Sequence, residues 1–238
     1  MISVSGKNWT ETRVNKNSLE KIKQDFKFSD IVSKLLISRN FDQNEIYEIQ
    51  NTSQIINPFK NNKDFIKASN ILENSIKYKH KVCIFGDYDV DGISSTSLFA
   101  NFFDHIKHPF FFYIPNREKD GYGPSVSLFK KINLKKTKLV IMVDCGSSSN
   151  EAIEYLKSRK IKSIIIDHHE INKPYPKANV IINPKKDNGY IEYSYLCATS
   201  LTYFFLELLI FKLGCKINIR KYLIYVLLAT VCDVMPLR

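Results

Sequence analysis

Five short apolar runs, the first four of them separated by segments with a helical pattern, constrain the fold of this 238-residue chain more than any other feature. The runs cover residues 82–85, 110–114, 139–143, 164–166 and 180–182. A continuous apolar run of this length predicts a strand buried on both faces, and helices between such strands predict βαβ units. We therefore expect an α/β fold with a mostly parallel five-stranded sheet and helices on both of its faces.

The residues before the first run have a different character. Residues 1–80 are polar, rich in lysine and asparagine, and helical in pattern. Ser29 and Asp30 precede apolar residues at helical spacing, which is typical of a capped amphipathic helix, and residues 64–79 repeat the pattern. We expect a small helical lobe over residues 1–80, followed by a catalytic domain over residues 81–238.

Composition limits the partners and the cellular setting. Lys and Arg number 35 against 24 Asp and Glu, which gives a net charge of +11. This charge favours a polyanionic partner, such as nucleic acid or an acidic membrane surface, although a lysine-rich surface can also serve solubility alone. The five cysteines are scattered, and the N-terminus has no apolar signal core. The longest apolar stretch, residues 196–211, is shorter than the ~20 residues of a membrane span. We expect a cytoplasmic protein with no membrane partner.

Acidic residues follow three of the five runs. Asp87, Asp89 and Asp91 come after the first run, Asp144 after the third and Asp167 after the fourth. The carboxyl ends of parallel strands share one crevice, so we expect these carboxylates to meet there. Two like charges about 4 Å apart repel by about 4 kcal/mol at an effective dielectric near 20. A bound divalent cation is the simplest compensation at neutral pH.

Two histidines, His168 and His169, extend this group. Neighbours on an extended chain point in opposite directions, so we expect them to have different roles. Oxygen-rich sites with one or two imidazoles suit Mn²⁺ or Mg²⁺, and two such ions about 3.5–4 Å apart support phosphoryl displacement. Two points stay open. The first is that an Asp between a strand and a helix is commonly an N-cap instead of a ligand. The second is that alternating residues point to the same side only in an extended chain, so the three acids of the first loop share one side only if that loop is extended.

The segment after the second run lies at the same expected edge. Arg117 can hold a phosphate in bidentate fashion, Gly121 and Gly123 permit close backbone approach, and Tyr122 can stack on a base. An ordinary glycine-rich surface turn is the alternative. Asp233 stands near the C-terminal end of a predicted helix, where the dipole disfavours a carboxylate. It is therefore either compensated by a cation or simply exposed.

Four motifs, in this order, resemble those of the DHH phosphoesterase superfamily. They are Gly-Asp-Tyr-Asp-Val-Asp-Gly at 86–92, Val-Asp-Cys-Gly at 143–146, Asp-His-His at 167–169 and residues 229–237. The segment that contains Arg117 and the helical lead-in are similar to the RecJ branch, and the resemblance runs from about residue 30 to the last residue. It implies a DHH domain and a two-metal-ion 5′→3′ exonuclease that acts on single-stranded DNA in DNA repair and recombination.

The resemblance also implies roles for individual residues. The ligands of two Mn²⁺ or Mg²⁺ ions would be Asp89, Asp91, Asp144, His168 and Asp233, with Asp144 bridging. His169 would face the scissile phosphate, while Arg117, with residues 121–123, would hold a substrate phosphate. Asp87 belongs to the first motif, either as a ligand or as a supporting catalytic residue.

One departure from the resemblance concerns length. RecJ-like proteins continue past the fourth motif into a second, DHH-associated domain, and many carry an OB-like domain; we expect neither within these 238 residues. The resemblance thus implies a truncated reading frame, a fragment, or half of a split enzyme whose partner chain supplies these domains, and such a chain could be inactive alone. An oligonucleotide or cyclic-dinucleotide phosphodiesterase and a non-catalytic nucleic-acid-binding fragment are the alternatives.

Overall fold

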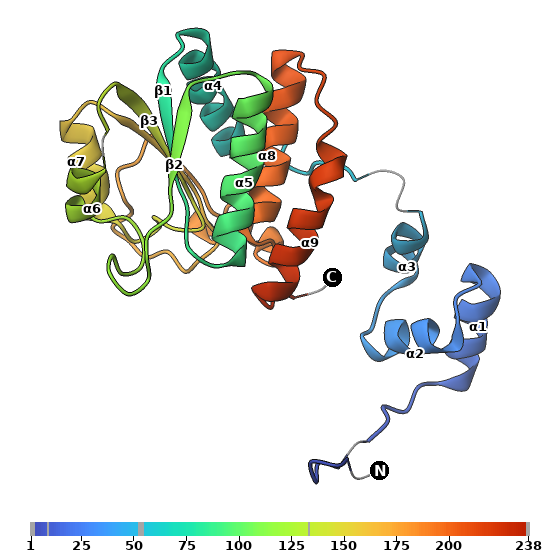
Figure 1. The fold of residues 1–238 in the computed structure, drawn as a ribbon. Coiled ribbons are helices and arrows are strands. Elements are labelled where there is room, and N and C mark those ends of the chain that lie inside the picture. The colour runs from blue at the N-terminus through green and yellow to red at the C-terminus, as the bar shows by residue number, and fades with distance from the viewer. Residues whose placement is uncertain (1–2, 9, 52–54, 133, 237–238) are drawn as a thin grey trace. The chain divides into compact units, whose positions relative to one another are not determined.

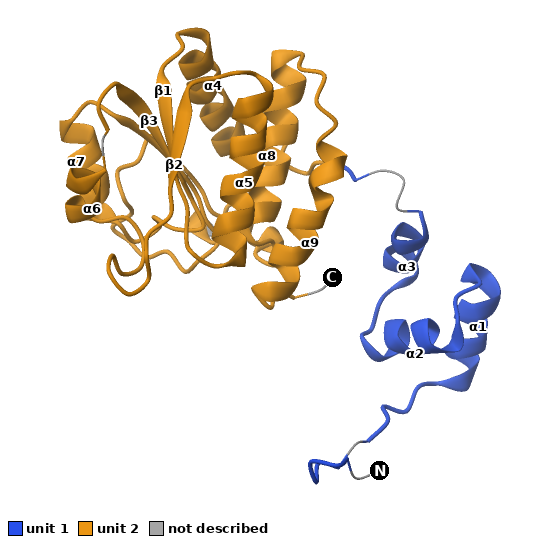
Figure 2. Ribbon diagram, viewed as in Figure 1, with its two compact units in different colours: residues 1–56 blue, residues 57–238 orange. Residues whose placement is uncertain are grey.

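The computed structural model describes residues 3–8, 10–51, 55–132 and 134–236, and the chain divides into two compact units, residues 1–56 and 57–238 (Figure 2). Leu237, the last residue of the fourth motif, lies outside the described residues. The helices are α1 (Lys16–Phe26), α2 (Asp30–Ser38), α3 (Gln43–Gln50), α4 (Lys63–Lys77), α5 (Val90–His105), α6 (Val126–Lys131), α7 (Asn150–Ser158), α8 (Ala198–Leu213) and α9 (Leu223–Cys232), with short 3-10 helices at Lys186–Asn188, Ile191–Tyr193 and Ile219–Tyr222. The strands are β1 (Lys81–Phe85), β2 (Phe110–Tyr113), β3 (Thr137–Val143), β4 (Lys162–Ile166) and β5 (Val180–Ile182).

The first unit consists of three short helices with polar caps. Asn15, Ser29 and Asp42 are the N-cap residues, and each accepts hydrogen bonds from backbone N–H groups of the first turn that would otherwise lack a partner. The cap at Ser29 confirms the helix start predicted there. Among the described residues of this unit, the buried apolar side chains are those of Leu19, Leu36 and Ile46.

The helix α4 belongs to the second unit and not to the helical lobe. The two units divide between residues 56 and 57, whereas the lobe was predicted to reach residue 80. The reason is packing: α4 is amphipathic, and its buried side chains Phe65, Ala68 and Leu72 join the core beside the sheet. Phe59, ahead of α4, stacks on Phe65 with ring centroids 4.3 Å apart.

The second unit is built on a five-stranded sheet in which all strands are parallel, in the order β2-β1-β3-β4-β5 (Figure 1). This confirms the predicted α/β class. The chain leaves β1 toward β2 on one side and returns to β3 on the other, so the direction of winding reverses between β1 and β3. Open parallel sheets bind ligands outside the carboxyl ends of the strands at such a switch point.

Helices cover both faces of this sheet, as expected. The helices α6 and α7 pack on one face, and α4, α5 and α8 on the other, with α9 against α5 and α8 (Figure 1). Successive strand residues point to opposite faces, so Leu139, Ile141 and Val143 of β3 join the α5 and α8 side while Val140 and Met142 join the α6 and α7 side. Burial on both faces explains why β3 reads as an unbroken apolar run.

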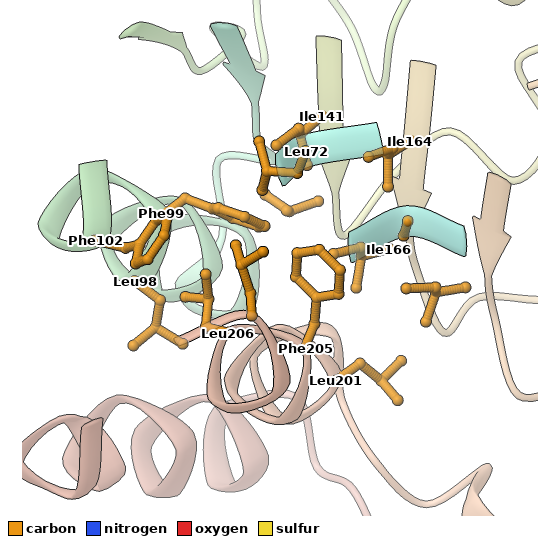
Figure 3. Packing of buried hydrophobic residues seen from close by; sticks show 14 of the residues in the cluster. Leu72, Leu98, Phe99, Phe102, Ile141, Ile164, Ile166, Leu201, Phe205 and Leu206 are labelled. Atoms are coloured by element: carbon orange, nitrogen blue, oxygen red, sulfur yellow. The ribbon is translucent and has the colours of Figure 1, made fainter. Parts of the chain in front are cut away.

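The larger core fixes where α5 and α8 begin. Figure 3 shows Phe99 of α5 and Phe205 of α8 meeting beside the sheet residues Ile141 and Ile166, all of them fully buried. Close packing of such side chains leaves little freedom for either helix to shift. Their first turns are therefore held firmly at the carboxyl edge of the sheet.

The apolar segment at 196–211 contributes α8, a 16-residue helix of the core. In the described ranges, no helix has both the length and the apolar character needed to cross a membrane. All five cysteines are free thiols, and Cys83, Cys145 and Cys197 are buried.

Candidate metal centre

The carboxyl edge of the sheet at the switch point gathers acids and histidines from four segments of the chain. Among the described residues, three groups of side chains each place their donor atoms within 4.8 Å of one another. These groups are Asp87, Asp89 and Asp144; Asp144, His168 and His169; and Asp91, His168 and Asp233. The structure thus brings together every residue predicted as a metal ligand. Asp144 and His168 are each shared by two of the groups.

Asp144 has the environment that most calls for a cation. It leaves β3 with a left-handed φ of +60°, and only 1% of its surface is exposed. Neither carboxylate oxygen makes a hydrogen bond to any described residue. Burial, followed by repulsion from Asp91 and Asp89, raises the pKa of Asp144 to about 12. A buried carboxylate of this kind must be protonated or neutralised, so it fits a site for divalent cations.

His168 faces three carboxylates at once. Its Nε2 lies 3.2 Å from Asp233 Oδ2, 3.3 Å from Asp144 Oδ1 and 3.6 Å from Asp91 Oδ2. Even so, Nε2 has no hydrogen-bond partner of good geometry among the described residues. Burial lowers the pKa of His168, which favours the neutral imidazole that binds metals. The donor set of one imidazole and several carboxylates suits Mn²⁺ or Mg²⁺.

The first motif does not stay extended. Asp89 is the N-cap of α5, and its Oδ1 accepts a hydrogen bond of 2.9 Å from the Gly92 N–H. The helix begins at the next residue, so Asp91 already lies in a helical turn while Asp87 precedes the cap. The condition for alternation, an extended loop, is therefore not met. Asp89 serves as an N-cap and, at the same time, belongs to the acidic cluster.

Asp91 reaches the cluster through its contacts with α8. Its Oδ1 accepts a hydrogen bond of 2.8 Å from the Thr199 N–H, and its Oδ2 accepts one of 2.7 Å from the Ala198 N–H. The Thr199 hydroxyl donates to the Asp91 carbonyl at 2.9 Å. The N-terminus of α8 thus stabilises the charge of Asp91 and fixes the side chain beside His168.

Gly92 allows the first turn of α5 to pack against the loop that carries Asp87. A Cβ at Gly92 would lie 2.5–2.7 Å from backbone atoms of Asp87, so the Gly92→Ala variant must displace that loop. We expect a loss of about 1–3 kcal/mol in the free energy of unfolding, measured by urea denaturation. Gly189→Ala is the matched control, because its Cβ would meet only Lys186 O at 3.6 Å. Equal losses in both variants would contradict the packing argument.

Asp167 orients His169. Its Oδ1 accepts hydrogen bonds from His169 Nδ1 at 2.8 Å and from the His168 N–H at 2.8 Å, and its Oδ2 accepts one from the Ser147 N–H at 3.0 Å. Burial opposes ionisation, but the hydrogen bonds from His169 and Ser147 outweigh it and hold the pKa of Asp167 at about 2. The hydrogen bond to Asp167 also raises the pKa of His169. With Nδ1 committed to Asp167, the half-exposed ring has Nε2 left for a ligand.

Asn183 is a further positioning residue, for which the sequence predicted no role. It directly follows β5 and is fully buried. Its Nδ2 donates to Ser147 Oγ and to the His169 carbonyl, both at 2.9 Å. It therefore ties the loops after β3 and β4 together. Asn183 directly follows the fifth apolar run, just as Asp144 and Asp167 directly follow theirs. This position in the sequence could have identified it as a site residue.

The loop after β2 lies beside these groups, as predicted. Tyr122 Oη is 3.5 Å from His169 Nδ1, with the ring centroids 6.0 Å apart. The glycines on either side of Tyr122 have left-handed φ values of +77° and +73°. The Arg117 guanidinium lies 5.5 Å from the ring centre of Tyr88 in the first motif. The structure thus brings Tyr122 to His169 and Arg117 to the first motif, while phosphate binding by either stays a prediction.

The metal-free protein is expected to lose stability as the pH rises from about 4. The pKa of Asp144 is higher in the folded than in the unfolded state, so the folded chain keeps a proton that the unfolded chain releases in this window. Stability then falls by up to about 1.4 kcal/mol per pH unit. Denaturation in EDTA from about pH 5 to pH 8 measures this slope, and Asp144→Asn should flatten it. A slope that the substitution leaves unchanged would contradict the charge repulsion assigned to Asp144.

Comparisons with known proteins identify the family and the fold. The sequence model of the DHH family, N-terminal domain, matches residues 81–230. The chain is 26% identical over 232 residues to the single-stranded-DNA-specific exonuclease RecJ of Bacillus subtilis, with 96% of this chain covered, and 32% identical over 182 residues to that of Escherichia coli, with 72% covered. The structure of RecJ from Thermus thermophilus in complex with Mn²⁺ superposes with a TM-score of 0.72 at 18% identity, covering 94% of this chain and 31% of that one.

The chain spans only part of these relatives. It covers 29% of the Bacillus subtilis protein and 32% of the Escherichia coli protein. The part matched by the family model contains all the acids and histidines of the candidate metal centre except Asp233, which lies three residues beyond the end of the match at residue 230.

Proposed function

The chain belongs to the DHH family, and from this premise we propose that it is the catalytic domain of a metal-dependent phosphodiesterase that degrades single-stranded DNA from its 5′ end. One observation carries the proposal: the buried Asp144, whose oxygens have no hydrogen-bond partner among the described residues, is shared by two groups of metal-binding side chains. The substrate is supported by relatives named as single-stranded-DNA-specific exonucleases. The polarity follows from the resemblance to the RecJ branch.

The ligands that we propose for two Mn²⁺ or Mg²⁺ ions are Asp89, Asp91, Asp144, His168 and Asp233, with Asp144 common to both ions. The unpartnered atoms of Asp144 and His168 support this assignment. When bound, such ions activate water and neutralise the charge that develops on the phosphate. Asp87, whose Oδ1 is also buried without a hydrogen bond to a described residue, supports the first motif or completes the ligand set.

The remaining residues act on the substrate. Asp167 holds the His169 ring by its Nδ1 and raises the pKa of that ring, which favours the imidazolium. The Nε2–H of the imidazolium can donate a hydrogen bond or a proton to an oxygen of the scissile phosphate. Arg117 binds a neighbouring phosphate, for which its planar guanidinium is suited. Tyr122, 55% exposed beside His169, offers a ring for stacking on a base, and the left-handed turns at Gly121 and Gly123 hold it there.

We further propose single-stranded nucleic acid as the partner and the cytoplasm as the setting, with DNA repair and recombination as the processes served. The net charge of +11 supports the polyanionic partner. The five free thiols support a reducing compartment.

Hydrolysis of two substrates tests the proposal. A long DNA single strand labelled at its 5′ or 3′ end and a short dinucleotide are each incubated with the protein and Mn²⁺. The expected result is early release of the 5′ label as mononucleotide, with a higher kcat/KM for the long strand. Preference for the dinucleotide would indicate an oligonucleotide phosphodiesterase instead. Strand binding without Mn²⁺-dependent cleavage would indicate a non-catalytic nucleic-acid-binding domain.

A further inference from the structure

Two adjoining hollows open at the amino edge of the sheet, which is the edge opposite to the metal centre. Their volumes are about 220 Å³ and about 360 Å³, and Lys160 and Lys162 line both. We call the shared surface the lysine hollow. Its residues are Asn74, Ser75, Tyr78, His80, Lys138, Lys157, Lys160, Ile161, Lys162, Ser163, Lys177 and Asn179.

The lysine hollow is formed where the strands begin. His80 directly precedes β1, Lys138 is the second residue of β3, Lys162 is the first residue of β4 and Asn179 directly precedes β5. The metal centre lies where the same strands end. Six residue steps separate Lys138 from Asp144, and at about 3.3 Å each they place the two sites about 20 Å apart. The hollow is thus a separate surface from the site described above.

The charge of the hollow is strongly one-sided. Five lysines line it, and none of the described residues that line it is acidic. Lys177 has one carboxylate nearby, Glu154 at 3.8 Å, and the other four form no ion pair with a described residue. All five side chains are exposed. Such a concentration of unpaired positive charge favours an anionic ligand with several charges.

Helix ends explain only part of this cluster. Lysine near the C-terminus of a helix is favoured by the dipole, and Lys157 occupies such a position in α7. Lys138 and Lys162, however, lie in strands, and Lys177 lies in the loop before β5. The helix dipole therefore does not explain why these three lysines line the same hollow.

An aromatic pair lies in the same hollow. Tyr78 is 63% exposed, and its ring stacks on His80 with centroids 5.8 Å apart and planes inclined by 25°. The ammonium group of Lys77 lies 5.7 Å from the centre of the Tyr78 ring. An exposed ring backed by a second ring and surrounded by lysines provides both elements of single-strand binding, a flat surface for a base and cations for the phosphates.

We propose that the lysine hollow is a second binding site for single-stranded nucleic acid, in which Lys138, Lys160 and Lys162 bind backbone phosphates and Tyr78 stacks on a base. The inference rests on the proposed function, since it takes the ligand to be the same strand that the metal centre cleaves. A strand long enough to reach both edges of the sheet is held at the hollow while its end is cut. A dinucleotide cannot reach both.

Binding of a fluorescein-labelled oligothymidylate in EDTA, followed by anisotropy over a range of salt concentrations, tests the proposal on the full chain. Lys160→Glu combined with Lys162→Glu is expected to weaken binding at least tenfold and to lower the salt slope by about 1.4, which is about 0.7 for each phosphate contact. Tyr78→Ala is expected to weaken binding at least fivefold. Lys16→Glu combined with Lys21→Glu makes the same change in charge on exposed residues of α1, and this control is expected to bind as the wild type does.

Unchanged binding by the Lys160 and Lys162 variant, or equal weakening by the α1 control, would overturn the proposal. If Tyr78→Ala binds as the wild type does, the stacking role is overturned, and the hollow is a surface that binds polyanions in general.

Measurements of hydrolysis distinguish a failure of this inference from a failure of the proposed function. The hollow variants are expected to raise KM for the long strand about fivefold or more and to leave dinucleotide hydrolysis unchanged. If no substrate is hydrolysed by the wild type, the proposed function fails, and the anisotropy result still decides the binding site.

Discussion

Asp144→Asn is expected to lower the rate of Mn²⁺-dependent phosphodiester hydrolysis by about 10³-fold or more. Asparagine keeps the shape of the side chain but removes the charge that a shared cation requires. Asp144 belongs to two of the three metal-binding groups, so its loss affects both. We expect Mn²⁺ binding, measured by calorimetry, to weaken at least tenfold. Hydrolysis under single-turnover conditions gives the rate.

The control for this prediction is Asp104→Asn, an exposed acid of α5 outside the cluster. It makes the same chemical change and is expected to alter neither the rate nor Mn²⁺ binding. Stability gives a second check. The folded metal-free wild type must keep Asp144 protonated, whereas asparagine has no such requirement, so in EDTA near pH 7 the variant should unfold at a temperature equal to or above that of the wild type. Equal Mn²⁺ binding by Asp144→Asn and the wild type would refute the shared role of Asp144.

His169→Ala is expected to reduce kcat by about 10²–10⁴-fold while Mn²⁺ binding changes less than about tenfold. The reason is the separation of roles between the two histidines. His168 Nε2 is buried among three carboxylates, whereas His169 is half exposed and bonded through Nδ1 to Asp167. The rate and calorimetric measurements above serve for this variant too.

The exposed His105 at the end of α5 offers the matched control, and His105→Ala should behave as the wild type does. Because His169 also lies within 4.8 Å of Asp144 and His168, a role as a metal ligand is the competing explanation. A loss of Mn²⁺ affinity as large as the loss of rate would establish that explanation and contradict the role toward the phosphate.

Much of the fold could be predicted because the sheet is buried on both faces. Val140 and Met142 face α6 and α7 while Ile141 and Val143 face the larger core, so both sets are apolar and the run is continuous. The start of the second unit could not be placed in the same way. The exposed face of α4 is mostly polar, and only the structure shows that Phe65 and its buried neighbours pack beside the sheet.

The candidate site could be predicted where a residue directly follows a strand, as Asp144 does. The local geometry of the first motif could not, because it depends on α8. Asp91 is fixed by the N–H groups of Ala198 and Thr199, which are more than 100 residues away in the sequence. The positioning roles of Asp167 and Asn183 depend in the same way on hydrogen bonds between separate loops.

The lysine hollow could not be predicted from the sequence either, because its residues come from separate segments of the chain. Lys138, Lys160 and Lys177 come from different segments, and no short stretch of the chain contains the cluster. The net charge of +11 predicts a polyanionic partner without locating its binding surface. Parallel strands that begin at one edge bring these residues together.

Anomalous diffraction from crystals of the chain grown with Mn²⁺ tests the central claim most directly. Our account predicts two anomalous peaks about 3.5–4 Å apart at the carboxyl edge of the sheet, with Asp144 bound to both and His168 to one. The absence of peaks among Asp89, Asp91, Asp144, His168 and Asp233 at saturating Mn²⁺, or a single peak that does not contact Asp144, would contradict it.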